Sequence, residues 1–148
     1  MRLLIGVDES PFSAAAVEFV RGMRWPEGSS VVVVSAVKSV VVAVPEAAMM
    51  MAESLEGLRR EQMAAAARLV KAVEAELAAA GLVAESRAVD GDPRDVLVDA
   101  CRTERADLVV LGSHGRTGLA KLVMGSVASH VVAHAPCSVL IVRRPAAG

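Results

Sequence analysis

Aromatic side chains are nearly absent from this sequence of 148 residues, which contains one Trp, two Phe and no Tyr. Proteins that bind single-stranded nucleic acids use aromatic rings as platforms on which the bases stack. The net charge is only −1, and no run of basic residues is long enough to form a phosphate-binding face. We therefore expect no nucleic-acid partner.

Long apolar runs are also missing. The most apolar stretch, residues 31–44, is interrupted by a lysine and two serines, so it falls short of the roughly 20 apolar residues that cross a bilayer. At the N-terminus only a short apolar run precedes Asp8, too short for the apolar part of a secretory signal. These absences predict a cytoplasmic protein with no membrane partner.

Cysteine is scarce, since the chain has only Cys101 and Cys137. Their separation matches neither a Cys-x-x-Cys motif nor the spacing of zinc ligands. A disulfide between them requires that the fold bring them together. Buried free thiols are the favoured interpretation.

Aliphatic residues must therefore build the core, and hydrophobic residues make up 54% of the chain. Apolar runs of strand length alternate with segments of helical periodicity. Strands are expected at residues 2–7, 30–37, 82–89, 107–112 and 138–143, and helices at residues 11–23, 53–80, 93–104 and 126–134. Residues 38–51 are apolar but irregular, and no element is assigned to them. The alternation predicts one α/β domain over residues 1–148, with helices on both faces of an open parallel sheet.

A glycine-rich segment follows the fourth expected strand. Gly112, Gly115 and Gly118 recur at intervals of three, and the pair Gly125-Ser126 stands where the next helix begins. Glycine has no Cβ, so backbone N–H groups can approach an anion closely there. A strand, a glycine-rich loop and a helix N-terminus, in this order, form the phosphate sites of α/β proteins.

The glycine spacing excludes two common phosphate-binding motifs. A Walker loop requires Lys-Ser/Thr directly after its last glycine, but Leu119 follows Gly118. A dinucleotide fingerprint requires Gly-x-Gly-x-x-Gly after the first strand, which here leads into VDESP. The spacing that remains is Gly-x-x-Gly, nine residues, then Gly-Ser.

With this spacing the chain resembles the universal stress protein family, specifically its ATP-binding branch, whose signature is Gly-2x-Gly-9x-Gly-Ser/Thr. Gly112, Gly115, Gly125 and Ser126 fill the four positions. The segments VDESP and PCSVLIVR near the two ends also resemble the family, so the likeness covers nearly the whole chain. The resemblance implies a Rossmann-like, doubly wound sheet with strand order 3-2-1-4-5, an order that the sequence alone does not fix.

That order implies where a ligand binds. The first and fourth strands become neighbours at the topological switch point, outside whose carboxyl ends ligands bind. Asp8 and Gly112 follow these two strands. Family members carry an aspartate at the position of Asp8, which implies contact with the nucleotide through ribose hydroxyls or through a metal on the phosphates. Backbone groups of Gly6 or Val7 and of Ala36 match the positions that read adenine.

The phosphates are expected on main-chain amides. The N–H groups of Gly115, Arg116 and Thr117 would hold one phosphate. Those of Ser126 and Val127 would hold another, with the dipole of the helix favouring the negative charge. The hydroxyl of Ser126 either donates to a phosphate oxygen or caps the helix. ATP is the expected cofactor, with Mg²⁺ or Mn²⁺ bound through its phosphates.

Three functions remain open at this stage. The first is an ATP-binding stress-response or regulatory protein, which the resemblance favours. A slow ATPase is the second, although residues 108–127 contain no carboxylate or Gln to orient a water. The third is a dimeric interaction module that binds no nucleotide. A homodimer is expected in each case, because the last strand would be an apolar sheet edge that, by the resemblance, pairs with its copy.

Overall fold

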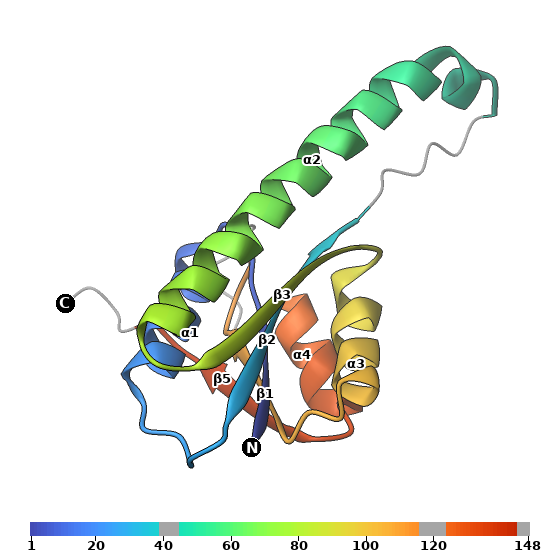
Figure 1. The fold of residues 1–148 in the computed structure, drawn as a ribbon. Helices are drawn as coiled ribbons and strands as arrows, with labels where there is room; N and C mark the ends of the chain where they lie inside the picture. Colours follow the sequence, from blue (N-terminus) through green and yellow to red (C-terminus); the bar gives the residue numbers. More distant parts are fainter. Residues whose placement is uncertain (39–44, 116–123, 145–148) are drawn as a thin grey trace.

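The computed structural model describes residues 1–38, 45–115 and 124–144, and within them five strands alternate with four helices (Figure 1). Every strand pair is parallel, and the strand order is β3-β2-β1-β4-β5, which confirms the expected doubly wound sheet. The elements are β1 (Arg2–Gly6), α1 (Pro11–Gly22), β2 (Ser30–Val37), α2 (Pro45–Ala79), β3 (Val83–Asp90), α3 (Pro93–Thr103), β4 (Leu108–Gly112), α4 (Ser126–His134) and β5 (Ser138–Val142).

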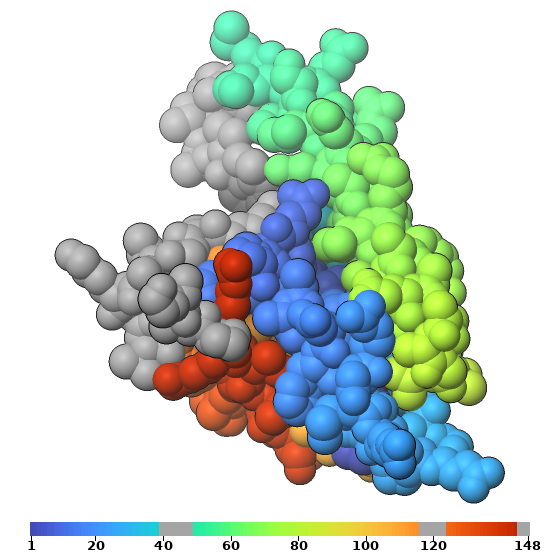
Figure 2. Space-filling model, turned by 90° about the vertical axis from the view of Figure 1, so that its left-hand side faces the viewer, coloured from blue at the N-terminus to red at the C-terminus, as the bar shows by residue number. Residues whose placement is uncertain are grey.

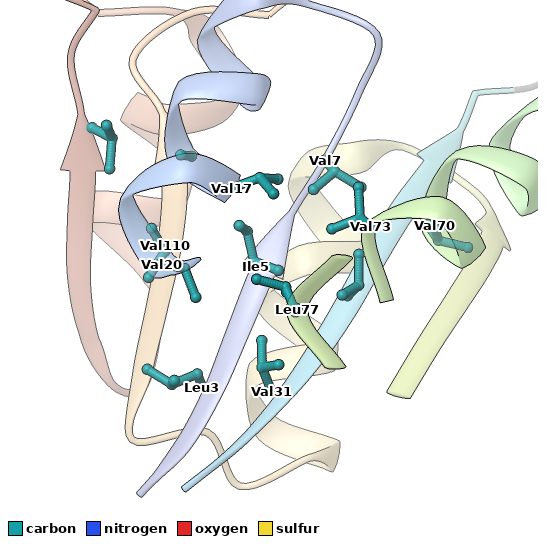
Figure 3. Packing of buried hydrophobic residues seen from close by; sticks show 13 residues of the cluster. Leu3, Ile5, Val7, Val17, Val20, Val31, Val70, Val73, Leu77 and Val110 are labelled. Carbon is teal, nitrogen blue, oxygen red and sulfur yellow. The ribbon is translucent and has the colours of Figure 1, made fainter. Parts of the chain in front are cut away.

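Two helices cover each face of the sheet, and the core is divided accordingly. Leu3 and Ile5 of β1 pack beneath α1 and α2, as Figure 3 shows, whereas Leu4 faces the cluster that contains Leu97 and Val98 of α3. Successive strand residues point to opposite faces, so both faces of β1 and β2 are apolar. Burial on both faces explains why these strands read as continuous apolar runs.

The helix ends follow the local chemistry expected from the sequence. Ser10 caps α1 with its side chain, which accepts a hydrogen bond from the N–H of Ser13 (3.1 Å), and Pro11 follows. Asp92 caps α3 in the same way. Gly81 stops α2 with a φ of +90°, a conformation that favours glycine.

The start of α2 differs from the expectation. Its helix begins at Pro45, whereas residues up to 51 were expected to be irregular. This first part of α2 extends beyond the body of the protein (Figures 1 and 2), where Met49 and Met50 are 83% and 89% exposed. Because no core contact imposes a periodic pattern there, only the proline at the start and the good helix formers Ala, Met and Glu mark the helix.

Ion pairs secure the amino edge of the sheet. The side chain of Glu104, which is 8% exposed, lies 2.5 Å from a guanidinium nitrogen of Arg2 and also pairs with Arg87. The hydrogen bond to Glu104 raises the pKa of Arg2. At this edge the backbone N–H of Arg2 also donates to the carboxylate Oδ2 of Asp107 (2.7 Å), and the backbone N–H of Asp107 donates to the carbonyl of Arg2 (2.8 Å). The end of α3 is thereby tied to β1 and β3.

Both cysteines are free, as the sequence favoured. Cys101 of α3 is buried in the core, whereas Cys137 is half-buried. The burial of Cys101, together with the nearby thiol of Cys137, raises the pKa of Cys101 to about 12. Among the described residues, none of the helices combines the length and the apolar character that crossing a bilayer requires.

Candidate functional site

A cleft of about 490 Å³ lies along the carboxyl edge of the sheet, within the size range of small-molecule sites. The ends of β1, β2 and β4 form its floor, the starts of α3 and α4 bound one side, and α2 bounds the other. All the described residues that the sequence predicted for the site line it: Gly6, Asp8, Ala36, Gly112, Gly115, Gly125, Ser126 and Val127. Arg116 and Thr117 lie outside the described residues.

The parallel sheet brings these residues together. β1 lies between β2 and β4, with Gly6 beside Val34 and Ile5 beside Val110. The carboxyl ends of the three strands therefore meet along one edge, about 4.8 Å apart from strand to strand. The cleft extends along this edge from the end of β2, past Asp8, to the glycine-rich loop after β4.

Asp8 is held in place by the start of α1. Its N–H donates to the hydroxyl of Ser13 (3.0 Å), and its carboxylate Oδ1 accepts a hydrogen bond from the N–H of Ser10 (3.0 Å). The second oxygen, Oδ2, lies only 2.9 Å from the point where a Cβ on Gly115 would be. One carboxylate oxygen is thus used locally, and the other faces the glycine-rich loop.

The glycines of the signature are required by space rather than by backbone conformation. None of Gly112, Gly115 and Gly125 has a positive φ. A Cβ on Gly112 would lie 2.6 Å from the carbonyl carbon and oxygen of Phe12, so this glycine lets α1 approach β4. A Cβ on Gly125 would lie 3.2 Å from the Cα of His114. Of these three glycines, only Gly115 borders the side chain of Asp8.

The start of α4 presents backbone donors to the cleft. Its N-cap is Gly125, whose N–H donates to the carbonyl of Ser113 (2.8 Å). The first helical hydrogen bond runs from the N–H of Ser129 to the carbonyl of Gly125 (2.9 Å), so the N–H groups of Ser126, Val127 and Ala128 have no acceptor within the helix. Ser126 occupies the first helical position, and the alternative of Ser126 as N-cap is wrong. These three residues line the cleft.

Several residues that line the cleft were not on the sequence-based list. Lys38, just after β2, lies at the end farthest from α4 and forms an ion pair with Asp92 (Nζ to Oδ2, 2.8 Å). The side chains of Gln62, Ala66 and Leu69 form the wall contributed by α2. Their participation depends on how α2 crosses the sheet, and no local sequence signal indicates it.

His114 also lines the cleft, although the sequence did not place it in the site. Its Nδ1 lies 3.1 Å from the hydroxyl of Ser113, and its ring centroid lies 5.0 Å from that of Phe12. These contacts fix the ring at the wall of the cleft.

The fold and the cleft define a doubly wound α/β protein with a cleft at its topological switch point, the place where such folds bind ligands. Comparison with known proteins specifies the class further, because the model of the universal stress protein family matches residues 1–143. The chain belongs to this family.

Relatives among known sequences carry the same family name. The universal stress protein MJ0531 of Methanocaldococcus jannaschii is 33% identical over 63% of this chain, and YxiE of Bacillus subtilis is 25% identical over 96% of it. The chain spans 53% of the length of MJ0531 and 64% of that of Sll1388 from Synechocystis, but 98% of YxiE.

Solved structures share the fold over nearly the whole chain. The structure of MJ0577 superposes with a TM-score of 0.86 at 23% identity, covering 99% of this chain and 97% of the other. A universal stress protein in complex with cAMP matches with a TM-score of 0.64 at 25% identity, covering 97% and 96%. The Arabidopsis thaliana family protein with AMP bound matches with a TM-score of 0.65 at 19% identity, covering 99% and 93%.

Proposed function

We propose that this protein is an ATP-binding stress-response protein that holds the nucleotide phosphates on its glycine-rich loop and on the N-terminus of α4. The observation that carries the proposal is the arrangement at the end of β4. There Gly115 and the unpaired amides of α4 line one cleft, next to a carboxylate fixed at the end of β1. Such amides, together with the helix dipole, form an anion site.

The cleft is long enough to separate the three parts of a nucleotide. The ends of β2 and β4 are two strand spacings apart, about 10 Å. The phosphates would lie at the glycine-rich loop, the ribose beside Asp8, and adenine at the end of β2 near Ala36. An Asp carboxylate accepts hydrogen bonds, so Asp8 suits ribose hydroxyls.

Ligands named for the related structures support an adenine nucleotide. The related proteins include one in complex with cAMP, one with AMP bound, and one from Archaeoglobus fulgidus in complex with dAMP. These three ligands share the adenine base and one phosphate, but their phosphates differ. They support an adenine nucleotide here, and the two amide sites favour ATP among such nucleotides.

A divalent cation fits the phosphate end. The oxygen Oδ2 of Asp8 faces the glycine-rich loop, where a phosphate is expected. Two negative groups that lie so close together repel each other unless a cation lies between them. Among the described residues no cluster of three or more His, Cys, Asp or Glu could hold a metal. Mg²⁺ or Mn²⁺ would therefore bind mainly through the phosphates, and the free oxygen of Asp8 would contact either this cation or the ribose hydroxyls.

A binding function accounts for the site better than efficient hydrolysis. Asp8 and Glu9 are the acids among the described residues that line the cleft, and Oδ1 of Asp8 is already bonded to Ser10. The remaining oxygen, Oδ2 of Asp8, would be occupied by the ribose or by the cation on the phosphates, which leaves no oxygen of Asp8 to activate a water at the loop. We expect bound ATP to remain intact for many minutes. Steady release of ADP in a coupled assay, abolished by Asp8→Ala, would instead support the slow ATPase.

A homodimer formed through β5 is also part of the proposal. β5 hydrogen-bonds only to β4 in the described sheet, and its middle residues Val139, Leu140 and Ile141 are half-buried. An apolar edge strand is a surface for pairing with a second copy. Sedimentation at low concentration should show a dimer, whereas a monomer at micromolar concentration would contradict this part.

Calorimetric titration tests the nucleotide directly. ATP, ADP, AMP and cyclic AMP should each be titrated with and without Mg²⁺, and protein as purified should be heated to release any bound small molecule. We expect one ATP per chain, bound more tightly than AMP because more phosphate groups meet the amides. The absence of binding for all four nucleotides would refute the proposal and favour an interaction module.

A further inference from the structure

Two polar side chains in the cleft have no hydrogen-bond partner within the part of the chain that the structure describes. Ser35 of β2 is only 5% exposed, and Gln62 of α2 is half-buried. Both line the cleft, and neither forms a hydrogen bond with another described residue. No fully buried side-chain oxygen or nitrogen among the described residues lacks a partner, so the hydroxyl of Ser35 remains open to the cleft. A nearly buried polar group without a partner is unusual in a folded protein.

The fold places these two side chains at the same corner. Val31 and Val33 of β2 face the core beneath α2, and the alternation of the strand puts Ser35 on this face as well. Arg59, one turn before Gln62 on α2, bonds to Asp90 at the end of β3 (nitrogen to Oδ2, 2.5 Å). Gln62 is therefore held over the carboxyl ends of β2 and β3, away from the glycine-rich loop.

We infer that Ser35 and Gln62 bind the base of the nucleotide through their side chains. The inference rests on the proposed function, because it assigns a role at the base end of that same cleft. It differs from the expectation that backbone groups alone read the base.

The surroundings of the pair suit a flat heterocycle. Ala66 and Leu69 of α2 lie on one side of the cleft, and Pro93 and Leu97 of α3 lie on the other. These walls are aliphatic and offer no hydrogen bonds. The neighbouring ammonium group of Lys38 is occupied by Asp92 (2.8 Å). Base recognition by side chains at this corner therefore falls to Ser35 and Gln62.

The chemistry of an amide matches adenine. The carbonyl of Gln62 can accept from the exocyclic amino group of adenine, while its NH₂ donates to the adjacent ring nitrogen. The hydroxyl of Ser35 can donate to a further ring nitrogen. Guanine presents a carbonyl in place of the amino group and an N–H in place of the ring acceptor, and a carboxylate, which only accepts, would pair with that N–H and with the adjacent 2-amino group of guanine.

Gln62→Glu is the decisive variant, because a carboxylate keeps the shape of Gln62 but only accepts. Dissociation constants should be measured by calorimetry for ATP, GTP and inorganic tripolyphosphate, which has no base. We expect ATP to bind about tenfold more weakly and the ratio of ATP to GTP affinity to fall by at least tenfold, consistent with the loss of one hydrogen bond. The dissociation constant of tripolyphosphate should change far less.

Ala64→Glu is the matched control, since it adds the same charge on the exposed side of the same helix turn. It should leave the ATP-to-GTP ratio unchanged. Ser35→Ala, which removes only the hydroxyl, should weaken ATP binding severalfold and leave tripolyphosphate binding unchanged. Circular dichroism checks that this variant is folded.

The outcomes distinguish the two proposals. If the wild type binds ATP but Gln62→Glu changes the dissociation constants of ATP and GTP by the same factor, the base-reading role is refuted and the proposed function stands. If the wild type binds neither ATP nor tripolyphosphate, both fail. An unchanged ratio in Ser35→Ala together with Gln62→Glu would also overturn the inference.

Discussion

Replacing Gly115 with alanine should weaken ATP binding strongly while leaving the protein nearly as stable as the wild type. The new Cβ would lie 2.9 Å from Oδ2 of Asp8. That oxygen is the end of a side chain and can move aside by rotation, unlike a backbone atom. Gly115 has no positive φ, so alanine is not strained there. We expect the free energy of unfolding to change by less than about 1 kcal/mol.

The effect on binding follows from the same geometry. The methyl group occupies the space next to the amides where a phosphate would lie, and it displaces the carboxylate of Asp8. Losing one charge-assisted hydrogen bond costs about 1.5–3 kcal/mol, which corresponds to a roughly ten- to hundredfold higher dissociation constant for ATP. Calorimetry gives the dissociation constant, and urea denaturation gives the stability of the same preparation.

Gly57→Ala supplies the control for this experiment. Gly57 lies within α2, and nothing is within 4 Å of the position of its missing Cβ. Alanine should stabilise the helix by up to about 1 kcal/mol and leave ATP affinity unchanged. Unaltered ATP affinity in a folded Gly115→Ala protein would refute the amide cradle. A large loss of stability in Gly115→Ala would refute the assumption that the side chain of Asp8 can rotate away from the new methyl group.

Three further predictions concern stability. Gly112→Ala should lower the free energy of unfolding by about 1–3 kcal/mol in urea denaturation, because its Cβ would lie 2.6 Å from backbone atoms of Phe12. A stability equal to that of the wild type would show that the backbone of Phe12 can move away. Glu104→Gln should lower the free energy of unfolding by about 1–3 kcal/mol, because it weakens the ion pairs at the amino edge, and the denaturant slope should stay unchanged. An unchanged free energy of unfolding would mean that solvent replaces the carboxylate. The folded-state pKa of Cys101 is raised to about 12 by burial, above its unfolded value of about 8.5, so its burial stabilises the fold fully below pH 8.5 and progressively less up to pH 12. The stability difference between wild type and Cys101→Ala should therefore shrink by about 1.4 kcal/mol per pH unit above 8.5, and a constant difference would contradict the assigned pKa.

The sequence predicted the strands well because both faces of the central strands are buried. A parallel strand such as β2 reads as one apolar run, and glycines, prolines and N-cap residues mark its neighbours. Apart from the start of α2, every element ends within one residue of the expected position. The first turns of α2 were missed because Met49 and Met50 contact no core that would impose a periodic pattern.

The glycine signature predicted which residues meet, but not why each is glycine. Sequence alone does not distinguish a glycine that needs a positive φ from one that needs space. Gly81 belongs to the first kind, whereas Gly112 and Gly115 belong to the second. The wall of the cleft formed by Gln62 escaped prediction for a related reason. A side chain 26 residues beyond Ala36 meets it only through the crossing of α2 over the sheet.

The two edges of the sheet differ in how their polar groups are satisfied. At the amino edge, Arg2 bonds to Glu104 and Asp107 through side chain and backbone, so the polar groups there serve stability. At the carboxyl edge, the first amides of α4 and the side chain of Gln62 have no acceptor or donor among the described residues. Polar groups without a partner do not stabilise the fold. They form stabilising hydrogen bonds only when a ligand supplies the missing partners. An anion bound at α4 and a base bound at Gln62 would satisfy both ends of the cleft at once, so ATP should bind more tightly than tripolyphosphate or adenosine alone and raise the melting temperature more at the same ligand concentration.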